Sequence, residues 1–88
     1  MDKKFEKDMA KEILNLINQY NKLSDKKEVN KKLNELTHEL YYKKQNIISQ
    51  KMIDLALAIL SFTSASLKGG HYQDLTEFIP DLEEIINS

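Results

Sequence analysis

The sequence predicts an all-α protein, an antiparallel four-helix bundle with a short or kinked fourth helix. Three observations favour this fold. Apolar residues recur at intervals of three and four along separate segments, short polar stretches join these segments, and no segment shows the strict alternation of a half-buried strand. Because 88 residues are enough for one domain and no more, we expect residues 1–88 to form a single helical domain.

The first two predicted helices each have one apolar face. The first covers about residues 4–22, where apolar side chains follow the 3.6-residue helical period. These side chains are Phe5, Met9, Ile13, Leu16, Ile17, Tyr20 and Leu23. A second helix follows Asp25, which has the spacing of a capping pair with Glu28. The apolar face of this helix consists of Val29, Leu33, Leu36 and Leu40.

The third predicted helix is the most apolar and covers about residues 50–68, with Ser49 able to cap its start. Apolar residues leave it only a narrow outer stripe, which consists of Asp54, Ala58, Ser61, Ala65 and Lys68. We therefore expect it at the centre of the bundle. Gly69 and Gly70 should end it, because glycine adopts the left-handed backbone of a C-cap. The apolar stretch 55–62 is shorter than the roughly 20 residues that cross a bilayer, so we expect no membrane span.

The fourth segment begins near Asp74, which has the capping-pair spacing with Glu77. Its apolar face consists of Leu75, Phe78, Ile79, Leu82, Ile85 and Ile86. Pro80 interrupts this pattern, because proline inside a helix loses a hydrogen bond and clashes with the preceding turn. Either the helix kinks here, or a short turn precedes a new helix that begins at Pro80. We expect a kinked or two-part fourth helix.

The composition excludes several kinds of chemistry. The chain has no cysteine, which removes disulfides, thiolate metal sites and thiol nucleophiles and fits a reducing cytosol. Its first residues are charged and lead into no apolar signal segment, so we expect a cytoplasmic protein. All 13 basic residues are lysine. Because arginine provides the planar fork that reads guanine edges, we do not expect specific nucleic-acid recognition.

No set of residues has the spacing of a catalytic or metal site. His38 and His71 are the only histidines, and only Asp74 lies near one of them at a helical interval. A metal site needs three or four converging ligands, so we expect no metal and no cofactor. The hydroxyl residues between positions 61 and 66 have no histidine beside them to act as a base. We therefore expect no catalytic residues and a protein that is not an enzyme.

One pattern on the predicted surface could bind a partner. The acidic residues Asp74, Glu77, Asp81 and Glu84 follow intervals of three and four, which places them on one side of the last segment. An acidic stripe can steer a basic partner, but acids near a helix start also stabilise the helix dipole, and the sequence leaves both interpretations open. The predicted partner-binding residues are those of the stripe, with His71 and Tyr72 at the preceding turn.

The middle of the chain resembles a known family. Residues 40–59 read Leu-Tyr-Tyr-Lys-Lys-Gln-Asn-Ile-Ile-Ser-Gln-Lys-Met-Ile-Asp-Leu-Ala-Leu-Ala-Ile, and Leu-Lys-Gly-Gly closes the third helix. This stretch resembles the bacteriocin immunity proteins of Gram-positive bacteria, in the enterocin A type group. The shared features are an aromatic pair that ends one helix, a basic turn, an apolar doublet and a capped amphipathic helix.

The resemblance implies a cytosolic antiparallel four-helix bundle that protects a producer cell from its own pore-forming peptide. Such a protein acts at the membrane sugar transporter that the peptide uses as its receptor, and its C-terminal portion usually selects the cognate bacteriocin. This sequence departs from the family pattern in its compact beginning and its short, acidic, proline-bearing end. The alternative function is a small regulatory inhibitor or antitoxin that docks a helix face onto another protein. A phage could encode such a protein.

Overall fold

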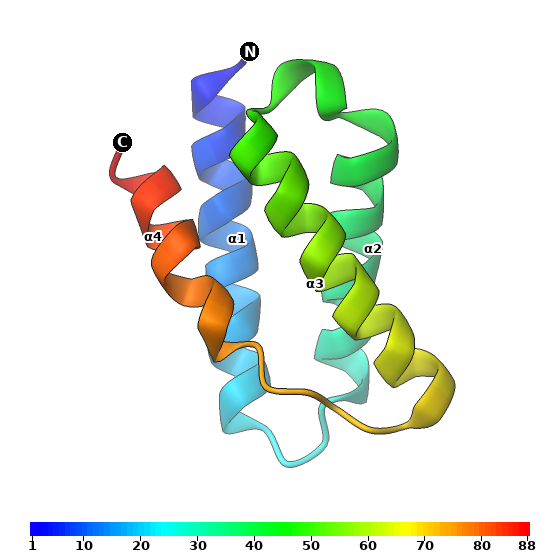
Figure 1. Cartoon of the computed structure of the whole chain (residues 1–88). Coiled ribbons are helices and arrows are strands. Elements are labelled where there is room, and N and C mark those ends of the chain that lie inside the picture. The colour runs from blue at the N-terminus through cyan, green and yellow to red at the C-terminus, as the bar shows by residue number, and fades with distance from the viewer.

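Four helices and two short 3₁₀ turns form the molecule, and the computed structural model describes all of residues 1–88. The elements are α1 (Lys3–Lys22), α2 (Lys27–Lys43), η1 (Gln45–Ile47), α3 (Gln50–Gly69), η2 (Thr76–Phe78) and α4 (Ile79–Ile86). Successive helices run in opposite directions, and both termini lie at the same end of the bundle (Figure 1). The predicted all-α antiparallel four-helix bundle with a shorter fourth helix is therefore confirmed.

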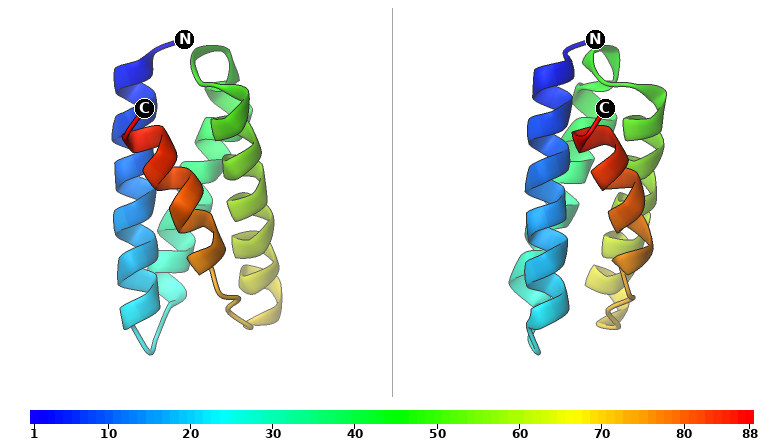
Figure 2. Two further views of the ribbon diagram at one scale, coloured as in Figure 1. Left: turned by 60° about the vertical axis from the view of Figure 1, so that its left-hand side comes forward. Right: turned by 90° about the vertical axis from the view of Figure 1, so that its left-hand side faces the viewer.

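Two helix pairs make up the bundle. α2 packs against α3, α1 packs against α4, and contacts between α1 and α2 join the pairs. α4 crosses the space between α1 and α3 on the side away from α2 (Figure 2). α1 and α3 have 20 residues each and α4 has 8, so α4 covers only part of their length. The outer side of α3 consequently has no helix over it.

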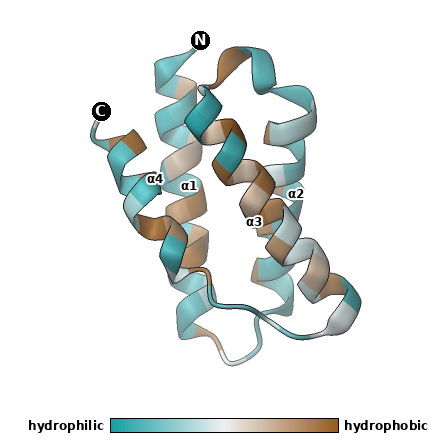
Figure 3. Ribbon diagram, in the orientation of Figure 1, coloured by the Kyte–Doolittle hydropathy of each residue, from teal (hydrophilic) through white to brown (hydrophobic).

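The core lies where the apolar faces of the helices meet. Apolar residues recur along every helix (Figure 3), and those that face inward are buried almost completely. Full burial of a single large apolar side chain contributes about 1.5–3 kcal/mol relative to leaving it exposed. The side chains with no exposed surface include Ile13, Ile17, Leu33, Met52, Ile59 and Leu82.

Both ends of α3 are capped as predicted. The Ser49 hydroxyl accepts a hydrogen bond from the Met52 amide at 3.2 Å. A carboxylate oxygen of Glu6, buried on α1, accepts a hydrogen bond from the Ser49 amide and ties α1 to this helix end. At the other end Gly70 has φ 68°, in the left-handed region, and its amide donates to the Ser66 carbonyl at 2.8 Å. The start and the end of α3 are therefore set by local chemistry that the sequence reveals.

The two predicted capping pairs are wrong. The N-cap of α2 is Lys26, and the Asp25 carboxylate accepts a hydrogen bond from the Lys27 amide at 3.1 Å instead. Asp74 accepts hydrogen bonds from the Thr76 amide at 2.9 Å and from the Thr76 hydroxyl at 2.6 Å. In both places the short aspartate side chain accepts a hydrogen bond from the amide two residues later, which closes a turn. This local turn competes with a capping pair, and the three-residue spacing does not distinguish the two.

The two-part arrangement of the fourth segment is confirmed, with one difference in its start. η2 forms a single 3₁₀ turn, and α4 follows it directly from Ile79 rather than from Pro80. Pro80 therefore lies in the first turn of α4. Its missing amide hydrogen costs little there, because the first amides of a helix have no partner within the helix.

α3 is less enclosed than the sequence predicted. Ile59 has no exposed surface, but Leu57 and Leu67 are 41% and 49% exposed, and Ala58, predicted to face water, is half-buried. The difference arises because α2, the helix that packs against α3, covers only one side of it (Figure 2). α3 also has the length and apolar composition at which a helix can cross a membrane, a property that core helices of soluble proteins share.

Polar side chains connect α2 to α3 inside the bundle. The fully buried Asn30 donates from Nδ2 to the Thr63 carbonyl at 3.1 Å, while its Oδ1 has no partner. Asn34 donates from Nδ2 to the Thr63 hydroxyl at 3.0 Å and to the Ser64 hydroxyl at 2.9 Å. Because a buried polar group is costly without its partner, these contacts favour one register of α2 against α3.

Candidate partner-binding surface

The residues of the predicted acidic stripe are exposed along the last segment. α4 packs against α1 with Leu82 and Ile85 buried beneath it, which turns its charged residues outward. All members of the stripe are exposed to solvent, from the loop before η2 to the end of α4. They are Asp74, Glu77, Asp81 and Glu84.

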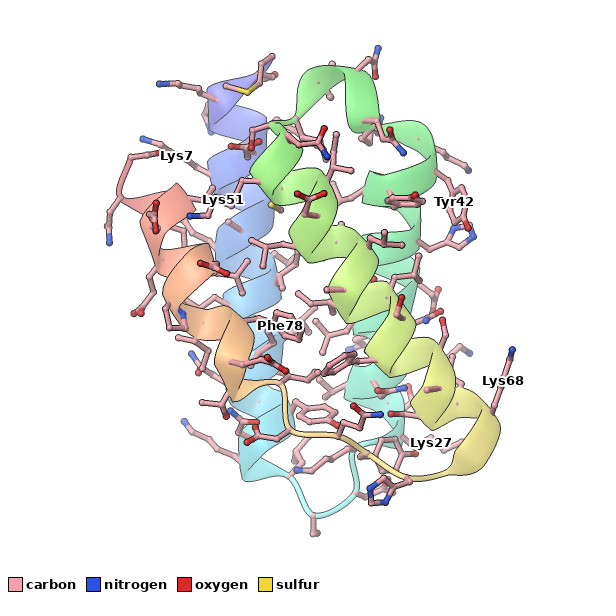
Figure 4. All side chains as sticks on the ribbon, viewed as in Figure 1. Lys7, Lys27, Tyr42, Lys51, Lys68 and Phe78 are labelled. Carbon is pink, nitrogen blue, oxygen red and sulfur yellow. The ribbon has the colours of Figure 1, made fainter.

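Lys51 of α3 contacts the half of the stripe that lies on α4. Its Nζ is 2.9 Å from Oε1 of Glu84 and 3.9 Å from Oδ1 of Asp81, and Figure 4 labels it beside α4. The three side chains are 38–73% exposed, so these pairs are solvated and contribute at most about 1 kcal/mol. Sequence reasoning missed Lys51, because only the packing of α4 beside α3 brings the charges together.

The loop before η2 is anchored on the end of α1. The Tyr20 hydroxyl donates to the Gln73 carbonyl at 2.6 Å. The ring of Tyr72 meets the ring of Tyr20 edge to face, with 6.4 Å between centroids. Tyr72 is therefore half-buried and helps to hold the loop, whereas His71 is exposed and makes no hydrogen bond or ion pair. Of the predicted partner-binding residues, Tyr72 therefore offers only part of its surface, and the other five are exposed.

The charge state of this loop follows from its hydrogen bonds and burial. The hydroxyl and amide of Thr76 hold the pKa of Asp74 below its ordinary value, so this carboxylate is ionised at neutral pH. Burial raises the pKa of Tyr20 above its ordinary value, and the nearby Tyr72 and Asp74 act in the same direction. The Tyr20 hydroxyl therefore remains a donor to the loop at neutral pH, beside the charged Asp74.

Tyr20→Phe should lower the free energy of unfolding by about 1 kcal/mol at neutral pH, because the Gln73 carbonyl loses its donor. The stability of the variant should also fall less than that of the wild type when the pH is raised. The pKa of Tyr20 is higher in the folded chain than in the unfolded one. The contribution of the neutral Tyr20 side chain to the free energy of unfolding is therefore complete below the ordinary tyrosine pKa of about 10, and it is lost as pH rises through the folded value. Urea unfolding of both proteins at about pH 7 and pH 11 measures this. An equal loss of stability in the two proteins between about pH 7 and about pH 11 would contradict this role of Tyr20.

Two shallow hollows lie on the surface, and one of them includes Glu84 of the acidic stripe. One of about 490 Å³ lies between α1 and α2 and is lined by Glu12, Leu16, Lys32, Glu35, Leu36 and Glu39. The other, of about 280 Å³, lies near the two termini, where α4 ends, and its charged lining residues are Lys3, Glu6, Lys7, Lys51 and Glu84. No three His, Asp or Glu side chains come together in an arrangement that could hold a metal ion.

Comparisons of the chain with protein-family models, with curated proteins and with solved structures found no significant match. The fold and the surface define a small all-α bundle whose last helix has an acidic outer face.

Proposed function

We propose that this chain is a non-enzymatic binding protein of the bacteriocin immunity type, which protects the cell that makes a pore-forming peptide. The observation that carries the proposal is the resemblance of residues 40–59 to that family, in a chain that folds as an antiparallel four-helix bundle. This is the fold that the resemblance implies. In this chain the stretch extends from the end of α2 through η1 into α3.

The features behind the resemblance form one continuous corner of the bundle. Tyr41 is half-buried and Tyr42 is 64% exposed, with their rings edge to face and 5.0 Å between centroids. After the basic turn, Ile48 of the apolar doublet is buried in the core and Ser49 caps α3. The corner therefore combines a structural turn with an exposed aromatic ring, which could contact a partner (Figure 4).

In the proposed mechanism the protein binds the sugar transporter of the membrane when a bacteriocin occupies it. The family resemblance assigns the choice of bacteriocin to the C-terminal portion, which here consists of η2 and α4 with the acidic stripe. A surface of one charge sign raises the rate of encounter with a basic surface and disfavours acidic ones. The acidic stripe is thus the proposed selective element.

Expression of this chain in a bacteriocin-sensitive Gram-positive host should raise the inhibitory concentration of one or a few related pore-forming peptides. Protection should be narrow, because one surface selects the peptide. The host carrying an empty vector provides the baseline. A folded, soluble chain that protects against no member of a broad bacteriocin panel would contradict the proposal. In that case a regulatory inhibitor or antitoxin that docks a helix face becomes the preferred function.

A further inference from the structure

α3 has an outer face that no other helix of the chain covers. Most of the exposed residues of α3 lie within about 40° of Ser61 around the helix axis, because each residue advances the helix by about 100°. They form a straight strip about 27 Å long. The residues of this strip, called here the α3 outer face, are Gln50, Asp54, Leu57, Ser61, Ala65 and Lys68.

The middle of the α3 outer face is apolar or small, and its only charges lie toward the ends. Leu57 is 41% exposed there, a large apolar side chain without a partner. Asp54 accepts a hydrogen bond from the Gln50 side chain at 2.9 Å but has no ion pair. Lys68 also has no ion pair and points away from the bundle (Figure 4). Two opposite charges are therefore free at opposite ends of one apolar strip.

The α3 outer face is complementary to itself when its direction is reversed. Asp54 lies seven residues before Ser61 and Lys68 lies seven residues after it. Leu57 and Ala65 lie four residues before and after the same serine. A reversed copy centred on Ser61 therefore places Asp54 level with Lys68 at both ends, and Leu57 level with Ala65 on both sides of the centre.

We propose that the α3 outer face binds a second copy of this chain, with the two α3 helices antiparallel around a two-fold axis at Ser61. Such an interface uses the same patch on both copies, as most homodimers do. The short side chains of Ser61 and Ala65 let the helix axes approach to about 8–10 Å, and Leu57 fills the space beside Ala65. This inference is independent of the proposed immunity function.

The charges select the antiparallel arrangement over the parallel one. In an antiparallel pair each Asp54 meets a Lys68, whereas a parallel pair would place Asp54 against Asp54 and Lys68 against Lys68. Like charges in contact disfavour association and so suppress the parallel register. A single helix face buries less than a standard interface, so we expect a reversible dimer with a dissociation constant of roughly 10–500 µM.

Sedimentation equilibrium of the full chain from about 10 µM to 1 mM tests this interface. The wild type should pass from monomer to dimer across this range. Leu57→Glu should remain a monomer, because it places two carboxylates near the centre of the interface. Leu67→Glu is the matched control: Leu67 is 49% exposed on the same helix but lies about 120° around it from Ser61, so this variant should dimerise like the wild type.

Charge reversal tests the antiparallel register. Asp54→Lys or Lys68→Asp alone should weaken dimerisation roughly 3- to 30-fold at low salt, because each creates two like-charge contacts. Both reversals in one chain should restore the wild-type constant. A wild type that is monomeric at 1 mM would overturn the proposal. Equal effects of Leu57→Glu and Leu67→Glu, or a double reversal that dimerises no better than the single ones, would also overturn it.

Discussion

Replacing Ile59 by aspartate should abolish the cooperative unfolding of the bundle. Ile59 has no exposed surface and belongs to the main core cluster, so the new carboxylate would have neither water nor a cation beside it. Burial of an unpaired charge costs several kcal/mol of stability. Loss of the buried apolar side chain costs about 1.5–3 kcal/mol more. A domain has only about 5–15 kcal/mol in total, so the variant should not hold its fold.

Thermal melts followed by circular dichroism measure this effect. Two controls separate charge burial from substitution as such. Ile59→Val should cost about 0.5–1.5 kcal/mol and keep a cooperative transition. Leu67→Asp places the same carboxylate on the same helix at an exposed position, so it should change stability by only about 0.5 kcal/mol. A melt of Ile59→Asp that resembles the wild type would mean that Ile59 is not buried in the core as described above.

Removing the charges of Glu77, Asp81 and Glu84 should slow the capture of a basic partner by roughly tenfold or more at low ionic strength. Exposed charges act mainly on the association rate, and salt screens them, so the variant should also respond less to salt. The fold should tolerate the three replacements, which are Glu77→Gln, Asp81→Asn and Glu84→Gln. The largest loss is the solvated pair with Lys51, which contributes at most about 1 kcal/mol.

The matched control removes the same number of charges from another part of the surface. Glu12→Gln, Glu35→Gln and Glu39→Gln together neutralise the hollow between α1 and α2 and leave the acidic stripe intact. If both triple variants slow association equally, only net charge matters. If neither does, the interface lies elsewhere, and the lysine-rich outer face of α2 is the first alternative.

The parts of the fold that sequence reasoning predicted are those that local chemistry determines. Helical periodicity identified the helices, because burial of one face demands a repeat near 3.6 residues. Ser49 and Gly70 cap α3 through bonds within a few residues of themselves, and Pro80 marks a helix start for equally local reasons. Local sequence gave a wrong prediction at Asp25, because a turn and a capping pair need the same residue type.

Contacts between distant segments could not be predicted. The Glu6 carboxylate reaches the Ser49 amide, 43 positions away in the chain, and Lys51 meets α4 only once the bundle has formed. The exposure of Leu57 depends on which side of α3 packs against α2. These features follow from how the helices pack, which one sequence does not encode in its spacing.

The candidate site shows the same division. Spacing placed Asp74, Glu77, Asp81 and Glu84 on one side of the last segment, and these residues are exposed there. The anchoring of the loop by Tyr20, which leaves Tyr72 half-buried, depends on contacts more than 50 residues apart in the chain. The ion pair between Lys51 of α3 and Glu84 of α4 likewise leaves no trace in the sequence of either helix.

The proposed immunity function is tested most directly by capture from membranes. The tagged chain is mixed with detergent-solubilised membranes of a host that it protects, with and without the matching bacteriocin. We expect the membrane sugar transporter to co-purify when the bacteriocin is present and not when it is absent, with less recovered by the Glu77, Asp81 and Glu84 triple variant than by wild type. Recovery of no transporter under either condition, or of a soluble protein independently of the bacteriocin, would contradict this function.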